Sequence, residues 1–109
     1  MSTELVIKVA LADDHKIFRD GIKMALKGKE YLKILWEAED GKDLMHKMQI
    51  KKPDVLLMDI RMPEVDGVNA IGILRKEYSD VKIVVLTMYD EQEMITKMME
   101  MGANAYLTK

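Results

Sequence analysis

Short apolar runs alternate with segments of helical spacing along this chain. Four runs are rich in β-branched residues, at positions 5–12, 32–36, 55–58 and 81–86, and a weaker fifth run spans 103–108. Three of the four are nearly continuous rather than alternating, which favours strands buried on both faces of a parallel sheet. We therefore expect five strands in one sheet.

Four amphipathic segments separate these runs, each with apolar residues three or four positions apart. Their apolar stripes are Phe18, Ile22, Ala25 and Leu26; Leu44, Met45 and Met48; Ile71, Leu74 and Tyr78; and Met94, Ile95, Met98 and Met99. Strand–helix alternation of this kind predicts right-handed crossovers with helices on both faces of the sheet, which is a doubly wound α/β fold.

Turn and capping residues agree with these boundaries. Gly28 follows the first helix, and Gly102 is placed to end the fourth in a left-handed conformation. The Asp-Gly pairs at 40–41 and 66–67 open the second and third helices, and Asp90 is a candidate cap for the fourth. Each predicted helix thus has a start or a stop signal of its own.

The composition limits the function classes. A chain of 109 residues that is 49% hydrophobic and lacks cysteine forms one compact domain without disulfides or thiolate metal sites. The formal charge of −2 provides no basic surface for gripping nucleic acid. Because no apolar run reaches the length of a membrane span and no signal-peptide pattern opens the chain, we expect a soluble cytoplasmic domain without a membrane partner.

Polar residues stand just beyond the predicted strands, where open α/β sheets bind their ligands. Asp13 and Asp14 follow the first strand, Asp59 the third, Thr87 the fourth and Lys109 the fifth. Each of them alone is compatible with a helix cap, a turn or a solvated side chain. Three carboxylates in one cleft need a cation, however, and their oxygens suit Mg²⁺.

A lysine and a threonine beside a magnesium site indicate a phosphoryl group. The sequence contains no glycine-rich phosphate-binding loop, so the acceptor of that group must be a side chain. Asp59 is the natural nucleophile because it stands alone at the end of the central-looking strand.

These residues resemble the receiver domain of a two-component response regulator. The matching stretches are 9–15, 54–63, 66–67, 84–87 and 102–109, and the resemblance covers essentially the whole chain, residues 1–109, as one domain. It implies a flavodoxin-like (CheY-like) five-stranded parallel sheet with the strand order 2-1-3-4-5. The Asp-x-x-Met-Pro-x-x-x-Gly pattern that begins at Asp59 is the most specific part of the match.

The resemblance implies the chemistry of the acidic residues. Asp59 would accept a phosphoryl group from a histidine kinase and form an acyl phosphate. Asp14 and Asp59 would bind Mg²⁺ together with the backbone carbonyl of Arg61, and Asp13 would act through water. The cofactor implied is therefore Mg²⁺, and the partner is a histidine kinase.

The resemblance also implies a switch. Lys109 would pair with the phosphoryl oxygens, and Thr87 would hydrogen-bond one of them. Tyr106, three positions before Lys109, would be an aromatic residue that turns inward on activation. The activated domain would form a homodimer.

A finer resemblance is to regulators with a LuxR-type helix-turn-helix. Three segments carry this resemblance: Asp-Asp-His at 13–15, Arg-Asp-Gly at 19–21 and Leu-Thr-Met-Tyr at 86–89. It implies transcription regulation and DNA binding only through an output domain outside these residues.

Two other function classes compete with a phosphorylation-operated switch. A haloacid dehalogenase-type phosphohydrolase also uses an aspartate nucleophile and Mg²⁺, but that family requires a second aspartate two residues later, where this chain has Arg61. A silent interaction module would not need the intact set of acidic residues, threonine and lysine. We therefore expect a phosphoacceptor and not an enzyme, with at most slow autodephosphorylation.

The histidines and methionines have structural interpretations. We interpret His15 as a structural or capping residue, because no second histidine lies near it, and His46 as a solvated surface residue. The methionines of the fourth predicted helix follow helical spacing, which favours a core or partner face.

The end of the chain leads to a further expectation. The resemblance implies a fifth helix after the fifth strand, and the chain stops at Lys109. With the first helix alone on its face of the sheet, we expect parts of strands 1, 3 and 5 to be bare unless later residues or a partner cover them.

Overall fold

The computed structural model describes residues 5–61, 67–87 and 92–109. Within these ranges, the strands are β1 (Ile7–Ala12), β2 (Leu32–Ala38), β3 (Val55–Asp59), β4 (Lys82–Thr87) and β5 (Ala105–Thr108). The helices are α1 (Lys16–Leu26), α2 (Gly41–Ile50), α3 (Gly67–Glu77) and α4 (Gln92–Met101). No described helix is both long and apolar enough to cross a membrane.

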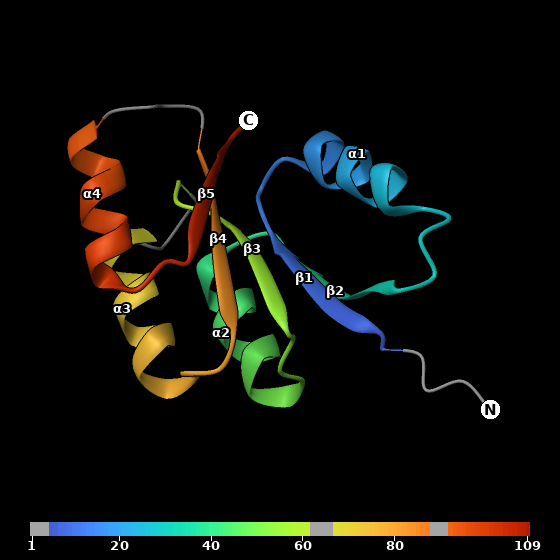
Figure 1. Cartoon of the computed structure of the whole chain (residues 1–109), viewed down its shortest axis with the longest axis horizontal. Helices are drawn as coiled ribbons and strands as arrows, with labels where there is room; N and C mark the ends of the chain where they lie inside the picture. Colours follow the sequence, from blue (N-terminus) through green and yellow to red (C-terminus); the bar gives the residue numbers. More distant parts are fainter. Residues whose placement is uncertain (1–4, 62–66, 88–91) are drawn as a thin grey trace.

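The strands form one parallel sheet in the order β2-β1-β3-β4-β5 (Figure 1). This order confirms the doubly wound fold and the strand arrangement that the resemblance implied. The last residue pairs of the four ladders are Ala12 with Ala38, Ala12 with Met58, Asp59 with Leu86, and Thr87 with Thr108. The carboxyl ends of β1, β3, β4 and β5 therefore lie at one edge of the sheet.

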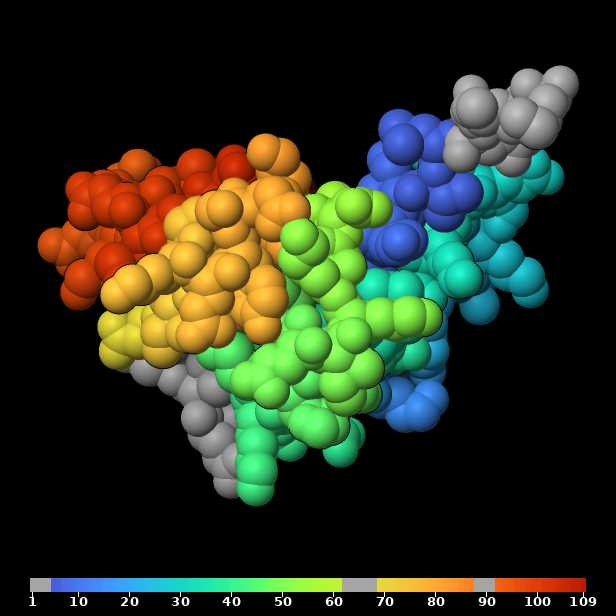
Figure 2. Space-filling view, turned by 90° about the horizontal axis from the view of Figure 1, so that it is seen from below, coloured from blue at the N-terminus to red at the C-terminus, as the bar shows by residue number. Residues whose placement is uncertain are grey.

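Helices α2, α3 and α4 pack against one face of the sheet. The main core residues there are Ala10, Ala12, Leu56, Met58, Ile83 and Val85 from the strands, and Leu44, Met48, Ile71, Leu74, Ile95 and Met98 from the helices. Figure 2, which views the molecule from below, shows the green, yellow and orange-red segments that contain α2, α3 and α4 side by side. The predicted apolar stripes of these helices are thus the core stripes, except at Met99, which is 41% exposed.

Helix α1 lies on the other side of the sheet, near β1 and β2 (Figure 1). No residue of α1 is fully buried. The expectation of bare strand surface is confirmed for β5, whose four residues are all exposed. It is wrong for β1, where Leu11 is only 1% exposed, because β1 lies between β2 and β3 and close to α1. It is met in part at β3, where Val55 and Leu57 are half-buried.

Strand boundaries differ from the predicted runs where pairing decides them. Strand β1 begins at Ile7 rather than Leu5 because Ile7 is the first residue that pairs with β2. Strand β2 extends to Ala38, beyond the apolar run, because Glu37 pairs with Leu11. Polar Glu37 is therefore carried to the same edge of the sheet as the acidic residues of β1.

Local signals end the helices as the sequence predicts. Gly28 and Gly102 have φ angles of 88° and 119°, the left-handed conformation that follows α1 and α4. At the start of α2, the Asp40 side chain accepts a hydrogen bond from the N–H of Asp43 at 2.7 Å. The predicted capping roles of Asp66 and Asp90 lie outside the described residues.

Candidate functional site

The carboxyl ends of the strands bring four predicted site residues to one place. Asp13 follows β1, Asp59 ends β3, Thr87 ends β4 and Lys109 follows β5. The ladder extends by main-chain hydrogen bonds from Asp13 N–H to Ala38 O at 2.9 Å and from Lys109 N–H to Thr87 O at 2.7 Å. Asp13, Asp59 and Thr87 are all buried, so the sheet presents a sheltered polar cluster at this edge.

The Lys109 ammonium joins the two buried carboxylates. Its Nζ lies 2.7 Å from Asp13 Oδ2 and 2.9 Å from Asp59 Oδ2, and the Lys109 side chain is 8% exposed. The same ammonium stands 4.7 Å from the centroid of the Phe18 ring, a cation–π contact with α1. A single positive charge thus holds together side chains from β1, β3 and β5.

Burial and charge act in opposite directions on Lys109. Burial lowers the pKa of its ammonium, but the nearby carboxylates of Asp13 and Asp59 raise it more. The pKa of Lys109 therefore stands above its usual value of 10.5. The ammonium remains charged at neutral pH and is available to a second anionic group.

Asp13 is held in place by α1 and β2. Arg19 Nη1 donates to the backbone oxygen of Asp13 at 2.5 Å, and Arg19 Nε donates to Glu37 Oε1 at 3.0 Å. Lys23 also reaches Glu37, with its Nζ 2.9 Å from Oε2. Sequence reasoning missed this link, because the partners stand on different elements and no motif connects them.

The cluster suits a divalent cation. Ligand atoms of Asp13, Asp14, His15 and Asp59 lie within 4.8 Å of one another. Three carboxylates against the one Lys109 ammonium leave an excess of negative charge. Among the described residues, the buried Asp13 Oδ2 accepts no hydrogen bond of good geometry, although the Lys109 ammonium is near it. Carboxylate oxygens with a spare lone pair fit Mg²⁺, so the residues present fit this ion.

The two remaining predicted metal-site residues lie at the rim. Asp14 is exposed, and its Oδ1 belongs to the same cluster. The backbone N–H of Arg61 donates to Asp59 Oδ1 at 2.9 Å, while the Arg61 side chain is exposed. The chain thus turns back onto the Asp59 carboxylate directly after β3.

His15 lies in the cluster rather than acting as a cap. It occupies the N-cap position of α1, but its side chain makes no capping hydrogen bond. Its Nδ1 lies 3.1 Å from Asp13 Oδ1 and 3.2 Å from Lys109 Nζ. The signal that could have found it is its position directly after the acidic pair. His46 is exposed, as its interpretation as a surface residue predicts.

Thr87 and Tyr106 share one face of the sheet. Thr87 pairs with Thr108, and Val85 pairs with Tyr106, so the alternation of side chains places Thr87 and Tyr106 on the same side. Thr87 is 2% exposed and Tyr106 is 42% exposed. The threonine of the predicted switch is therefore in the interior, and the tyrosine is at the surface.

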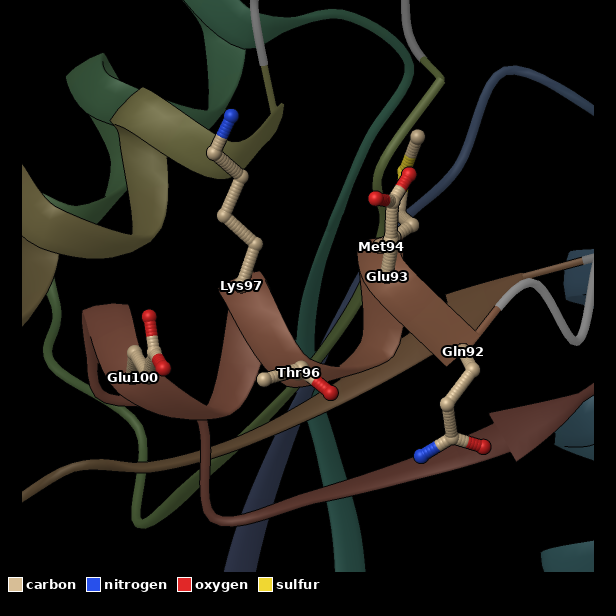
Figure 3. Close-up of a pocket in the computed structure, with 6 residues that line it drawn as sticks. All are labelled: Gln92, Glu93, Met94, Thr96, Lys97 and Glu100. Atoms are coloured by element: carbon tan, nitrogen blue, oxygen red, sulfur yellow. The ribbon is translucent and has the colours of Figure 1, made fainter.

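A separate pocket lies on α4 and differs from the polar cluster at the strand ends. It has a volume of about 500 Å³ and is lined by Gln92, Glu93, Met94, Thr96, Lys97 and Glu100. Figure 3 shows that the six labelled side chains all come from this one helix and point in different directions. Catalytic and binding groups need to converge on one point, so the polar cluster at the strand ends is the stronger candidate site.

Several known proteins are similar to this chain in sequence. A profile of the response regulator receiver domain matches residues 9–109. The chain is 38% identical over 103 residues to the transcriptional regulatory protein DegU of Brevibacillus brevis. This match covers 94% of this chain and 44% of DegU. It is 38% identical over 104 residues to the response regulator GacA of Pseudomonas aeruginosa, and this match covers 95% of this chain and 49% of GacA. The chain spans about half the length of these curated relatives.

Solved structures show the same likeness. The isolated REC domain of RcsB from Salmonella enterica serovar Typhimurium, in the presence of the phosphomimetic BeF3⁻, matches with a TM-score of 0.90 at 26% identity over 95% of this chain and 78% of that chain. The signal receiver domain of NarL from Mycobacterium tuberculosis matches with a TM-score of 0.88 at 28% identity over 95% of this chain and 84% of that chain. Both matches extend over nearly all of the chain described above.

Proposed function

Because the chain belongs to the family of response regulator receiver domains, we propose that Asp59 accepts a phosphoryl group from a histidine kinase. The observation that carries this proposal is the position of the Lys109 ammonium, 2.7 Å from Asp13 Oδ2 and 2.9 Å from Asp59 Oδ2. A sheltered carboxylate beside a fixed ammonium offers the arriving phosphoryl oxygens a charge partner that is already in place.

In the proposed step, Asp59 Oδ2 attacks the phosphorus of a phosphohistidine. An O–P bond forms and the P–N bond breaks, its electron pair stays on the leaving imidazole, and that nitrogen takes up a proton from water. The N–H of Arg61 holds Asp59 Oδ1 at 2.9 Å, which leaves Oδ2, on the Lys109 side, to react. The Lys109 ammonium then contacts the phosphoryl oxygens of the acyl phosphate instead of the free carboxylate.

The acidic residues would hold Mg²⁺ during this step. Asp14 and Asp59 would bind it directly together with the backbone carbonyl of Arg61, and Asp13 would act through water. When bound, the ion supplies neutralisation of the charge on the phosphoryl oxygens. The support for this assignment is the excess negative charge of the cluster and the spare lone pair of the buried Asp13 Oδ2.

The proposed product operates a switch. The Thr87 hydroxyl donates to a phosphoryl oxygen and moves toward Asp59, and Tyr106 turns into the space that it leaves. The support is that both residues lie on the same face of neighbouring strands. The change would repack α4 and β5 and favour a homodimer.

The output that we propose is control of transcription in the cytoplasm, through a helix-turn-helix domain of the complete protein. One support is the similarity to the transcriptional regulatory protein DegU, which is about twice as long as this chain. A second is that one solved relative, RcsB, is bound to the promoter rprA. DNA binding would belong to that output domain, since this chain has a formal charge of −2.

The phosphoacceptor assignment is tested with a small phosphoramidate donor, Mg²⁺ and intact-mass measurement. The wild-type chain should take up one phosphate and Asp59→Asn none, with an unchanged circular dichroism spectrum. Asp54→Asn is the matched control, because Asp54 lies just before the other end of β3, where its Oδ2 accepts from Lys8 N–H at 2.8 Å. This variant should take up phosphate like the wild type.

Other results would favour the competing functions. Full uptake by Asp59→Asn would contradict the assignment of the acceptor. Multiple turnover with release of inorganic phosphate would favour a phosphohydrolase, and no uptake by the wild type would favour a silent interaction module.

A further inference from the structure

We propose that His15 is a further ligand of the acidic site and makes it select divalent transition-metal ions, such as Mn²⁺ and Ni²⁺, over Mg²⁺. This inference rests on the metal site described under the proposed function and deepens it. It adds one nitrogen ligand to a set that otherwise consists of oxygen atoms.

The distances around His15 match those of a coordination shell. Its Nδ1 lies 3.1 Å from Asp13 Oδ1, 3.3 Å from Asp14 Oδ1 and 3.9 Å from Asp59 Oδ2. Ligand atoms that bind a metal at about 2.1 Å are roughly 3 Å apart when adjacent and about 4.2 Å apart when opposite. His15 Nδ1 can therefore join the carboxylates around one ion without a movement of the main chain.

The hydrogen-bonding roles of these atoms point in the same direction. The Lys109 ammonium is only a donor, and its Nζ lies 3.2 Å from His15 Nδ1. In the tautomer that accepts from Lys109, with the proton on Nε2, Nδ1 presents a lone pair to the cluster and does not donate to Asp13 Oδ1, which lies 3.1 Å away. The carboxylate oxygens of Asp13 and Asp14 present lone pairs to the same space. Lone pairs that face one another at about 3 Å repel unless a cation or a proton lies among them. This arrangement is the one that metal ligands adopt.

The ligand type decides the ion. Mg²⁺ prefers oxygen ligands and releases its waters reluctantly, whereas imidazole nitrogen suits the first-row transition metals, with affinity rising from Mn²⁺ to Ni²⁺. A site of carboxylates alone would not make this distinction to the same degree. We therefore expect the preference for Ni²⁺ over Mg²⁺ to depend on His15.

The His15 side chain can be replaced without disturbing the fold. It is 57% exposed, and the backbone N–H of His15, which donates to Asp13 Oδ1 at 2.8 Å, remains in any variant except proline. His46, the only other histidine of the chain, is exposed on α2 and provides the matched control.

The test compares wild type, His15→Ala, His15→Asn and His46→Ala by calorimetric titration with Ni²⁺, Mn²⁺ and Mg²⁺ separately. His15→Ala should lower the Ni²⁺ affinity by about tenfold or more and leave the Mg²⁺ affinity within about twofold. His15→Asn supplies an amide oxygen, so it should keep Mg²⁺ binding and lose the preference for Ni²⁺. His46→Ala should behave like the wild type.

Pulsed electron paramagnetic resonance of the Mn²⁺-loaded chain gives a direct second measurement. Modulation from a bound ¹⁴N nucleus should appear in wild type and His46→Ala and be absent in His15→Ala.

The inference is overturned if wild type lacks this nitrogen signal, if His15→Ala retains it, or if His15→Ala weakens Mg²⁺ and Ni²⁺ binding equally. In those cases the proposed magnesium site and the phosphorylation of Asp59 stand unaffected. Failure of the wild-type chain to bind any of the three ions would instead overturn the proposed metal site, and this inference with it.

Discussion

At the scale of single residues, Lys109 has the largest effect on the charge of the site. Its ammonium is the one positive group that contacts both buried carboxylates among the described residues. Without it, Asp13 and Asp59 would be two like charges sheltered from water, which is an expensive arrangement. Stability and metal binding should therefore both respond to the removal of this charge.

Lys109→Met should destabilise the chain by about 3 kcal/mol in the absence of divalent ions, because it leaves two buried carboxylates uncompensated. Added Mg²⁺ should reduce this loss, since the ion replaces part of the missing positive charge. Urea unfolding with EDTA and with Mg²⁺ measures both effects. Lys52→Met is the control, because its ion pair with Asp80 is exposed and should contribute little to stability. An equal loss in both variants would show that the buried charges need no cation.

At the scale of secondary-structure elements, Glu37 fixes α1 to the end of β2. The hydrogen bond from Lys23 lowers the pKa of Glu37 below its usual value of 4.5, burial opposes the shift, and Arg19 adds to it. Arg19 in turn holds the backbone of Asp13, so this contact between α1 and β2 also supports the site.

Glu37→Gln should lower stability at pH 7 by about 1 kcal/mol. A carboxyl with a depressed pKa stabilises the fold above its unfolded-state pKa, and this contribution is lost as the pH falls through its folded-state pKa. The difference in the free energy of unfolding between wild type and Glu37→Gln should therefore shrink below about pH 4.5. Urea unfolding at pH 7 and at pH 3.5 measures it, with the exposed Glu30→Gln as control. A difference that is the same at both pH values would mean that the Glu37 charge contributes nothing.

Gly102→Ala should destabilise the junction of α4 and β5 by about 2 kcal/mol. Gly102 has a φ of +119°, and a Cβ there would lie 2.7 Å from Arg75 Cγ. Gly21, inside α1, is the matched control, because a Cβ there would meet nothing within 4 Å. Gly21→Ala should stabilise the fold by about 0.5–1 kcal/mol through helix propensity. Thermal melting of the two variants tests the pair, and a Gly102→Ala variant as stable as wild type would refute the packing argument.

The elements also show how far the sequence alone can predict this structure. The continuous apolar runs and the turn residues predict the strands, and the position of Asp59 directly after an apolar run predicts that it meets Asp13 and Lys109. The link from Arg19 to Glu37 could not be predicted, because it depends on how α1 packs beside β2, 18 positions further along the chain. The place of the His15 ring could not be predicted either, because a residue at a helix start can turn toward the cap or toward the cluster.

At the scale of the whole molecule, the proposed switch operates only if a change at the acidic cluster reaches the surface of β5. Thr87 is buried and Tyr106 is exposed, on the same face of neighbouring strands. A ligand shifts a protein between two states only through contacts that differ between them. In the proposed mechanism, the Thr87 hydroxyl makes such a contact with a phosphoryl oxygen.

Thr87→Ala should accept a phosphoryl group at Asp59 and yet transmit little of the change to Tyr106. Thr87→Ser, which keeps the hydroxyl, should respond like the wild type. The chemical shifts of Tyr106 and of α4, recorded before and after addition of the phosphoryl mimic BeF3⁻, measure the response. A full shift of Tyr106 in Thr87→Ala would exclude this route through the molecule.

Asp59 is the one carboxylate that we propose receives the phosphoryl group, and that group can be located chemically. Borohydride reduces an aspartyl phosphate to homoserine, so the chain is treated with a phosphoramidate and Mg²⁺, reduced, and cut with trypsin. Asp54 and Asp59 both fall in the tryptic peptide 52–61, and fragmentation of this peptide distinguishes them. Homoserine is expected at position 59, with unchanged aspartate at 54, 13 and 14. Homoserine at any of these three positions with Asp59 intact would contradict this assignment.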